Sequence, residues 1–116
     1  MANVGEPLLL DLVIKDNDIV LLRIELYDVV GALFGSADCE KRQPLAYIAT
    51  LDSDLARRWF HAATVDSSNR RLLTIRAYMS LQGKEVYRQL PVYMNQETRQ
   101  VQPSVHAAVF VVDGNV

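Results

Sequence analysis

The chain of 116 residues has the length of one ordinary domain, enough for a hydrophobic core without disulfide or metal staples. Half of the residues are hydrophobic and 22% are charged, which excludes a disordered, collagen-like or low-complexity chain. The formal net charge of −2 excludes a globally basic nucleic-acid-binding protein. We therefore expect a single compact domain over residues 1–116.

The cysteine content and the lengths of the apolar runs indicate the compartment in which the chain is made and whether it crosses a membrane. Cys39 has no second cysteine for an internal disulfide, and no basic segment followed by an apolar run opens the chain. The longest apolar runs are far shorter than the roughly 20 residues that span a bilayer. We expect cytoplasmic synthesis and no membrane span.

The charge is divided unevenly between the two halves of the chain. Residues 1–56 carry four basic and ten acidic side chains, a net charge of −6. Residues 57–116 carry eight basic and four acidic side chains, a net charge of +4. Such a chain can complement a second copy head to tail, or it can present its basic half to phosphate groups.

Two apolar segments near the start predict a β-hairpin. Leu8–Lys15 and Ile19–Tyr27 flank the turn-forming residues Asp16–Asp18. A three-residue loop places the apolar side chains of both strands on one face. The same pairing sets Asp11 opposite Arg23, so we predict a cross-strand ion pair there rather than a catalytic acid.

The alternation of apolar side chains ends after this hairpin. Glycines punctuate the segment Asp28–Gln43, which predicts a long loop. Pro44–Thr50 then has the composition of a short third strand, with the proline at its start, where a missing N–H is tolerated.

One segment has convincing helical periodicity. Asp52 or Ser53 suits the N-cap of a helix over Asp54–Ala63, because the apolar side chains of that segment fall on one face. The opposite face carries Arg57 and Arg58. The first residue of the helix precedes them by three and four positions, the spacing of helical ion pairs.

The second half of the chain predicts another hairpin and a final strand. Leu72–Leu81 and Val86–Met94 alternate on either side of a two-residue turn at Gly83–Lys84. Pro91 cannot donate to a ladder, so its strand should lie at a sheet edge or contain a bulge there. Ser104–Gly114 is apolar on both faces, which predicts a central strand buried on both sides.

The resulting order, β-β-β-α-β-β-β, predicts a mainly β protein with one helix, folded as a small barrel or sandwich. The strand order is similar to that of the OB-fold, so an OB-like topology is one version of this prediction. No motif supports that version, and topology alone does not define function. The predicted core consists of Leu10, Leu12, Leu22, Ile24, Trp59, Ile75, Ala77, Val92, Val109 and Val111.

The sequence lacks the short motifs of common enzymes: a Gly-rich phosphate loop, G-x-S-x-G, H-E-x-x-H and C-x-x-C. His61 and His106 are the only histidines, too few for a metal site unless carboxylates come from scattered loops. Cys39 lies between Asp38 and Glu40, whose charges disfavour a thiolate. We assign no catalytic, metal-binding or cofactor-binding residue and expect a protein that is not an enzyme.

An apolar segment, Val29–Gly35, lies within the predicted loop, and such segments are typical of contact sites. The alternative is that it plugs the end of the barrel. Together with the oppositely charged halves, it favours a protein–protein interaction or assembly module that binds copies of itself or a protein partner. We expect a small homo-oligomeric structural subunit of a cellular or viral assembly. The predicted interface residues are Val29, Val30, Leu33, Phe34, Arg57 and Arg58.

Two other functions remain as alternatives. Basic and aromatic residues gather on the second hairpin, as in modules that bind single-stranded nucleic acid with cations and stacking rings. The residues for such an OB-like module are Arg76, Tyr78, Tyr87 and Arg88. A half-solvated sheet face has the same composition, however. A small ligand-binding barrel or an enzyme is the third alternative.

Overall fold

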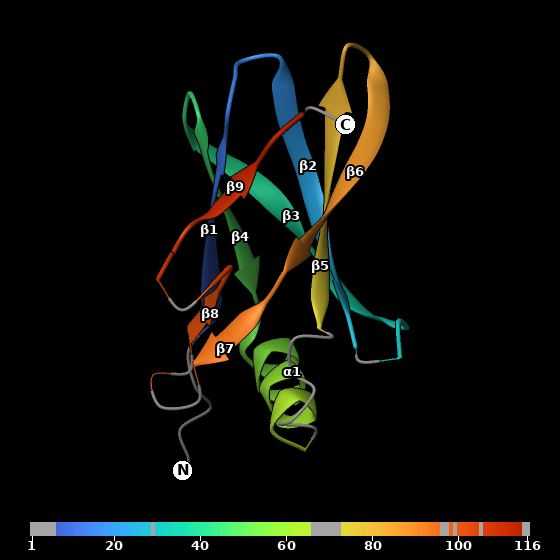
Figure 1. The fold of residues 1–116 in the computed structure, drawn as a ribbon, viewed down its shortest axis with the longest axis vertical. Helices are drawn as coiled ribbons and strands as arrows, with labels where there is room; N and C mark the ends of the chain where they lie inside the picture. Colours follow the sequence, from blue (N-terminus) through green and yellow to red (C-terminus); the bar gives the residue numbers. More distant parts are fainter. Residues whose placement is uncertain are drawn as a thin grey trace.

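Seven strands of the described residues form one long sheet that curls into a nearly closed barrel, with a helix across one end (Figure 1). The computed structural model describes residues 7–28, 30–65, 73–95, 98, 100–104 and 106–114. The elements within these residues are β1 (Leu8–Ile14), β2 (Ile19–Tyr27), β3 (Leu33–Gln43), β4 (Ala46–Leu51), α1 (Ser53–Val65), β5 (Thr74–Leu81), β6 (Lys84–Pro91), β7 (Tyr93–Asn95), β8 (Gln100–Gln102) and β9 (Phe110–Val112). The predicted class, mainly β with one helix, is confirmed.

The order of strands in the main sheet is β6-β5-β2-β3-β4-β1-β9, and β7 and β8 form a separate pair. β3 has 11 residues; its first half pairs with β2 and its second half with β4. This strand therefore joins the two parts of the barrel wall, as corner strands do in packed sheets. Four strands precede the helix, and the parallel β1–β9 pair departs from the OB-like version of the prediction.

The predicted hairpin between the first two strands is wrong. β1 pairs with β4 and β9, whereas β2 pairs with β3 and β5. Asp11 consequently lies opposite Ile48 of β4, and the predicted Asp11–Arg23 ion pair does not form. The alternation of apolar residues specifies which face of a strand is buried, but it does not specify the neighbouring strand.

The predicted loop Asp28–Gln43 is also wrong, because most of it is β3. Small residues occupy the inward positions of this strand: Gly35, Ala37 and Cys39. A Cβ atom on Gly35 would lie only 2.7 Å from Leu55 Cδ1 of α1. The strand is therefore built to let the helix approach closely, and it lacks the large apolar residues that usually indicate a strand.

Seven of the ten predicted core residues are buried, namely Leu10, Leu12, Ile24, Trp59, Ile75, Ala77 and Val92. Leu22 and Val109 are half-buried. A bulge in β2 between Leu21 and Arg23 explains why Leu22 is not fully buried. The extra residue shifts the inward alternation so that Leu21 is buried instead.

The last strand lies at the edge of the sheet and is not the predicted central strand over Ser104–Gly114. β9 pairs with the second half of β1 and is only three residues long. Phe110 and Val112 point into the core, whereas Val111 is 49% exposed. The segment is apolar on both faces, but only one of these faces is buried; the other is exposed.

The second hairpin forms with a different turn. Gln82 and Gly83, with φ of 53° and 82°, make the turn, and both angles are those of a type I′ turn. Ala77 therefore faces Arg88 of β6 rather than Leu90. The shift is two residues, so the inward face is unchanged. β6 lies at a sheet edge, as predicted from Pro91, and it ends at that proline.

Helix α1 confirms the predicted helix and one of its predicted caps. The backbone N–H of Leu55 donates to Asp52 Oδ1 at 2.9 Å, so Asp52 is the N-cap. Leu55, Trp59 and Phe60 are buried against the end of the barrel. Within the described residues, the structure contains no helix long and apolar enough to cross a membrane.

Replacing a fully buried residue of β2 should test this arrangement of the core. Ile24 has no exposed surface, so Ile24→Ala should lower the free energy of unfolding by about 2–5 kcal/mol. The matched control, Val111→Ala, removes a half-exposed side chain and should change it by less than about 0.5 kcal/mol. Equal effects in chemical denaturation would show that the inward face of β2 is assigned incorrectly.

Candidate interaction surfaces

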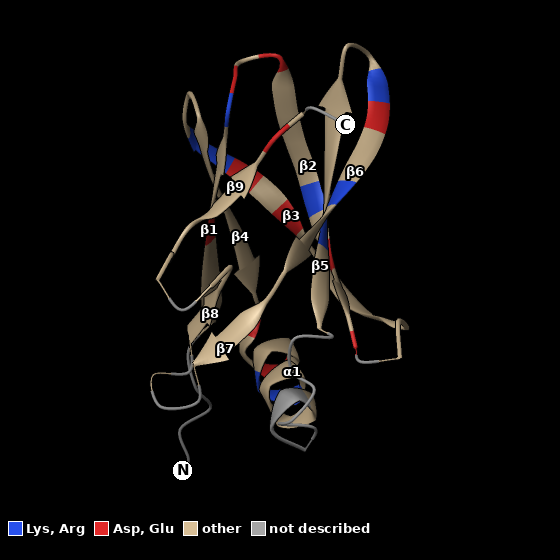
Figure 2. Ribbon diagram, viewed as in Figure 1, with Lys and Arg blue, Asp and Glu red and all other residues tan. Residues whose placement is uncertain are grey.

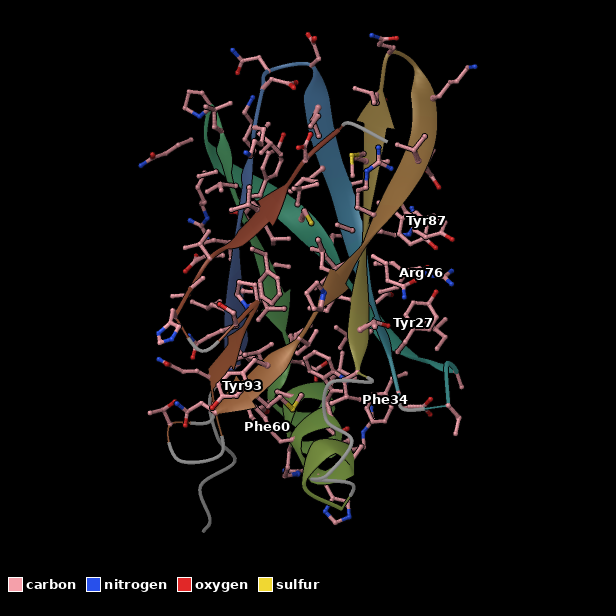
Figure 3. All side chains as sticks on the ribbon, in the orientation of Figure 1. Tyr27, Phe34, Phe60, Arg76, Tyr87 and Tyr93 are labelled. Atoms are coloured by element: carbon pink, nitrogen blue, oxygen red, sulfur yellow. The ribbon has the colours of Figure 1, made fainter. Side chains whose placement is uncertain are left out.

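The turn between β2 and β3 exposes large apolar side chains next to helix α1. Val30 is 81% exposed and Leu33 is 60% exposed. Phe34, labelled in Figure 3, is half-buried. The guanidinium of Arg58 lies 5.5 Å from its ring centroid. We call Val30, Leu33, Phe34, Arg57 and Arg58 the apolar tip. Val29, the sixth predicted interface residue, lies outside the described residues.

Hydrogen bonds within the turn hold the exposed residues of the tip in place. Asp28 Oδ1 accepts hydrogen bonds from the backbone N–H groups of Val30, at 3.0 Å, and Ala32, at 2.9 Å. Gly31 has φ of 84°, which glycine adopts without strain. Helix α1 lies across the barrel end (Figure 1), Phe34 packs against the core, and Val30 and Leu33 point to solvent.

The predicted ion pairs of the helix are confirmed. Asp54 Oδ1 lies 2.6 Å from Arg57 Nη2, and Asp54 Oδ2 lies 3.0 Å from Arg58 Nε. All three side chains are more than half exposed, so these pairs add little to stability. One carboxylate serves two guanidiniums, which leaves one net positive charge beside Phe34.

A second surface covers the outward face of β2, β5 and β6. The Arg76 guanidinium lies 4.6 Å from the ring centroids of both Tyr27 and Tyr87, between the two rings (Figure 3). Arg23 lies 4.2 Å from the ring centroid of Tyr78. The rings of Tyr78 and Tyr87 are 5.3 Å apart and inclined by 41°. We call these five residues the tyrosine–arginine face.

Two carboxylates on the same sheet face balance the charges of its two arginines. Tyr27 Oη donates to Glu25 Oε1 at 2.5 Å, and Arg23 Nη2 donates to Glu85 Oε2 at 3.3 Å. The hydrogen bond from Tyr27 lowers the pKa of Glu25, and Glu25 in turn raises the pKa of Tyr27 well above its usual range. Residues of the acidic and basic halves thus meet on one sheet face, and β3 and β6 each carry both signs of charge (Figure 2).

Three of the four predicted nucleic-acid-binding residues, Arg76, Tyr78 and Tyr87, lie together, but Arg88 does not. Its guanidinium donates to the backbone oxygens of Asp113 and Gly114, at 3.1 and 2.7 Å. Arg88 thereby bridges from the edge strand β6 to the segment after β9, where the barrel wall is open.

Sequence reasoning missed Arg23 and Tyr27, which come from a strand about 50 residues earlier in the chain than β5. The alternation Arg23-x-Glu25-x-Tyr27 on the solvent side of β2 is the signal that could have found them. One guanidinium lies over each of the three tyrosine rings, and carboxylates lie beside them. This surface is therefore less suited to stacking bases and binding phosphates than the sequence suggested.

Among the described residues, no group of three or more His, Cys, Asp and Glu side chains is placed to hold a metal ion. Burial, with a smaller contribution from Asp38, raises the pKa of the Cys39 thiol to about 12, so the reactive thiolate is disfavoured. His61 and His106 are both exposed.

Comparison with protein-family models, with curated proteins and with solved structures finds no match. Function is therefore inferred from the apolar tip and the tyrosine–arginine face themselves.

The lowered pKa of Glu25 predicts a pH dependence of stability. The folded-state pKa lies below the ordinary value of 4.5, so ionised Glu25 stabilises the fold above that pH, and this contribution is lost as the pH falls through the folded-state pKa. Glu25→Gln should lower the unfolding free energy near neutral pH and make its decline in acid shallower. The control is Glu40→Gln, which removes an exposed carboxylate. Parallel acid unfolding curves for wild type and Glu25→Gln would contradict the assignment.

The tyrosine–arginine face predicts weak or no binding of single-stranded nucleic acid. Fluorescence anisotropy of a labelled oligonucleotide at low and moderate salt should show no saturable binding at micromolar protein. Tight binding that falls steeply with salt, and that is lost in Arg76→Ala but retained in Arg42→Ala, would overturn this expectation. Arg42 provides the control because it is an exposed arginine on β3.

Proposed function

We propose that this protein is a non-enzymatic assembly module that self-associates, serving as a small homo-oligomeric subunit of a larger cellular or viral structure. The observation that carries the proposal is the apolar tip, where Val30 and Leu33 are 81% and 60% exposed beside Phe34. Clustered exposed apolar side chains are typical of contact sites. Fully burying a valine or leucine side chain contributes about 1.5–3 kcal/mol, so a partner that covers both gains a useful anchor.

The construction of the tip supports the same proposal. The turn is fixed by its own hydrogen bonds to Asp28, so little conformational freedom is lost when a partner binds. An arginine stacked on an aromatic ring is a frequent combination at the centre of interfaces. Arg57 and Arg58 are exposed and would orient an incoming partner through their charge.

The alternative, a module that binds single-stranded nucleic acid, has weaker support. Its cations are already stacked on tyrosines, and Arg23 is paired with Glu85. The ion pair on this face joins Arg23 of the acidic half to Glu85 of the basic half, so it leaves the opposite net charges of the two halves uncancelled.

A charge in the apolar tip should disrupt self-association. Phe34→Asp places a carboxylate where we expect the centre of the contact, and it should convert the oligomer to a monomer in light scattering across a range of concentrations. Replacing Arg57 and Arg58 by Glu should weaken the oligomer mainly at low salt, because exposed charges are screened at higher ionic strength.

The matched control for Phe34→Asp is Val20→Asp, which places the same charge at a 49% exposed apolar position near the opposite end of β2. This variant should associate like the wild type. An oligomer that survives Phe34→Asp would remove the tip from the contact, and loss of the oligomer in both variants would show a general effect of added negative charge.

A further inference from the structure

The outward face of β1 carries a second exposed apolar surface, on a different part of the molecule from the tip. Leu9, Asp11 and Val13 alternate with the buried residues of β1 and so point outward. Asp11 lies opposite Ile48 of β4, and Val13 lies opposite Val111 of β9. Leu9 is 56% exposed and Val111 is 49% exposed. We call these five residues the Asp11 patch.

A groove of about 120 Å³ opens beside this patch, and Leu9, Asp11 and Gln102 are among its lining residues. Its position follows from the sheet topology. β9 pairs only with Leu12–Ile14, so in the described residues the first half of β1 has β4 on one side and no paired strand on the other. The groove lies between this open edge and β8.

The carboxylate of Asp11 has no hydrogen bond or ion pair within the part of the chain that the structure describes. The arginine predicted to pair with it, Arg23, binds Glu85 on the other part of the sheet. The groove beside Asp11 is lined by apolar side chains and by the polar Gln100 and Gln102. A carboxylate in this setting is complementary to a cationic group that brings its own hydrogen-bond donors. An arginine guanidinium carried by an apolar surface has this chemistry.

We propose that the Asp11 patch is the receptor for the apolar tip of a second copy of this chain. This inference rests on the proposed function. The tip offers apolar side chains and exposed guanidiniums, and the patch offers apolar side chains and a carboxylate. Of the carboxylates next to the tip, Asp28 accepts hydrogen bonds from the backbone of the turn and Asp54 is shared by two arginines. A contact of tip with tip would instead bring the arginines of two copies together.

The location of the two surfaces determines the kind of assembly. The β2–β3 turn is at the lower right in Figure 1, whereas β1 and β9 are on the left. One copy can therefore use its tip and its patch at the same time, for two different neighbours. Such a head-to-tail contact produces a ring if the rotation closes and a filament if it does not.

Mixing two variants tests the pairing of tip with patch. Leu33→Asp damages an exposed residue of the tip and leaves the patch intact, whereas Asp11→Arg reverses the charge of the patch and leaves the tip intact. Each variant alone should be monomeric by size-exclusion chromatography with light scattering. An equimolar mixture should form a one-to-one dimer and nothing larger, because it contains one intact tip and one intact patch. Asp18→Arg, at an exposed carboxylate in the β1–β2 loop, should assemble like the wild type.

The outcomes separate this inference from the proposed function. A wild-type chain that stays monomeric overturns both. If Leu33→Asp is monomeric but Asp11→Arg assembles like the wild type, self-association through the tip stands and the patch is overturned as its receptor. If both variants are monomeric and their mixture is too, the head-to-tail pairing is overturned. Formation of the mixed dimer also shows that both variants are folded, because an unfolded chain cannot restore the contact.

Discussion

The close contact between β3 and helix α1 determines where the other features of this protein lie. Gly35 has no side chain, and the side chain of Leu55 occupies the space that a larger residue would need. The helix therefore lies directly across the end of the barrel, and the side chain of its Trp59 is fully buried. The same contact places Phe34, the residue before Gly35, against Arg58 and presents the β2–β3 turn beside the helix. The apolar tip is thus a consequence of how the barrel end is closed.

The surfaces of the barrel differ in how many of their charged and aromatic side chains contact partners within the same molecule. On the tyrosine–arginine face, guanidiniums stack on rings and pair with carboxylates, so charge and aromatic surface are used within one molecule. The apolar tip and the Asp11 patch are the opposite case. Each combines exposed apolar side chains with a charge, and the two charges have opposite sign. Surfaces of this kind gain more from a partner than a face that is already neutralised.

Local features of the fold were predictable from the sequence, and partners distant in sequence were not. The helix, its cap and its ion pairs depend on residues within four positions of one another. The helix and the ion pairs were predicted, and Asp52 was one of two predicted caps. The neighbour of β1 depends on the closure of the whole barrel, which strand periodicity does not encode. β3 was missed because its inward positions hold Gly35 and other small residues. Of the candidate surfaces, the tip was found from its composition, whereas the Asp11 patch requires β9 beside β1.

Amide NMR spectra of the unmodified chain, recorded as it is diluted, test head-to-tail self-association most directly. Head-to-tail contact should give concentration-dependent shifts in two separate groups, one at the β2–β3 turn and the start of α1 and the other along the outward positions of β1 and β9. The tyrosine–arginine face should not shift. Spectra that are identical at all concentrations, or shifts confined to the tyrosine–arginine face, would contradict head-to-tail contact.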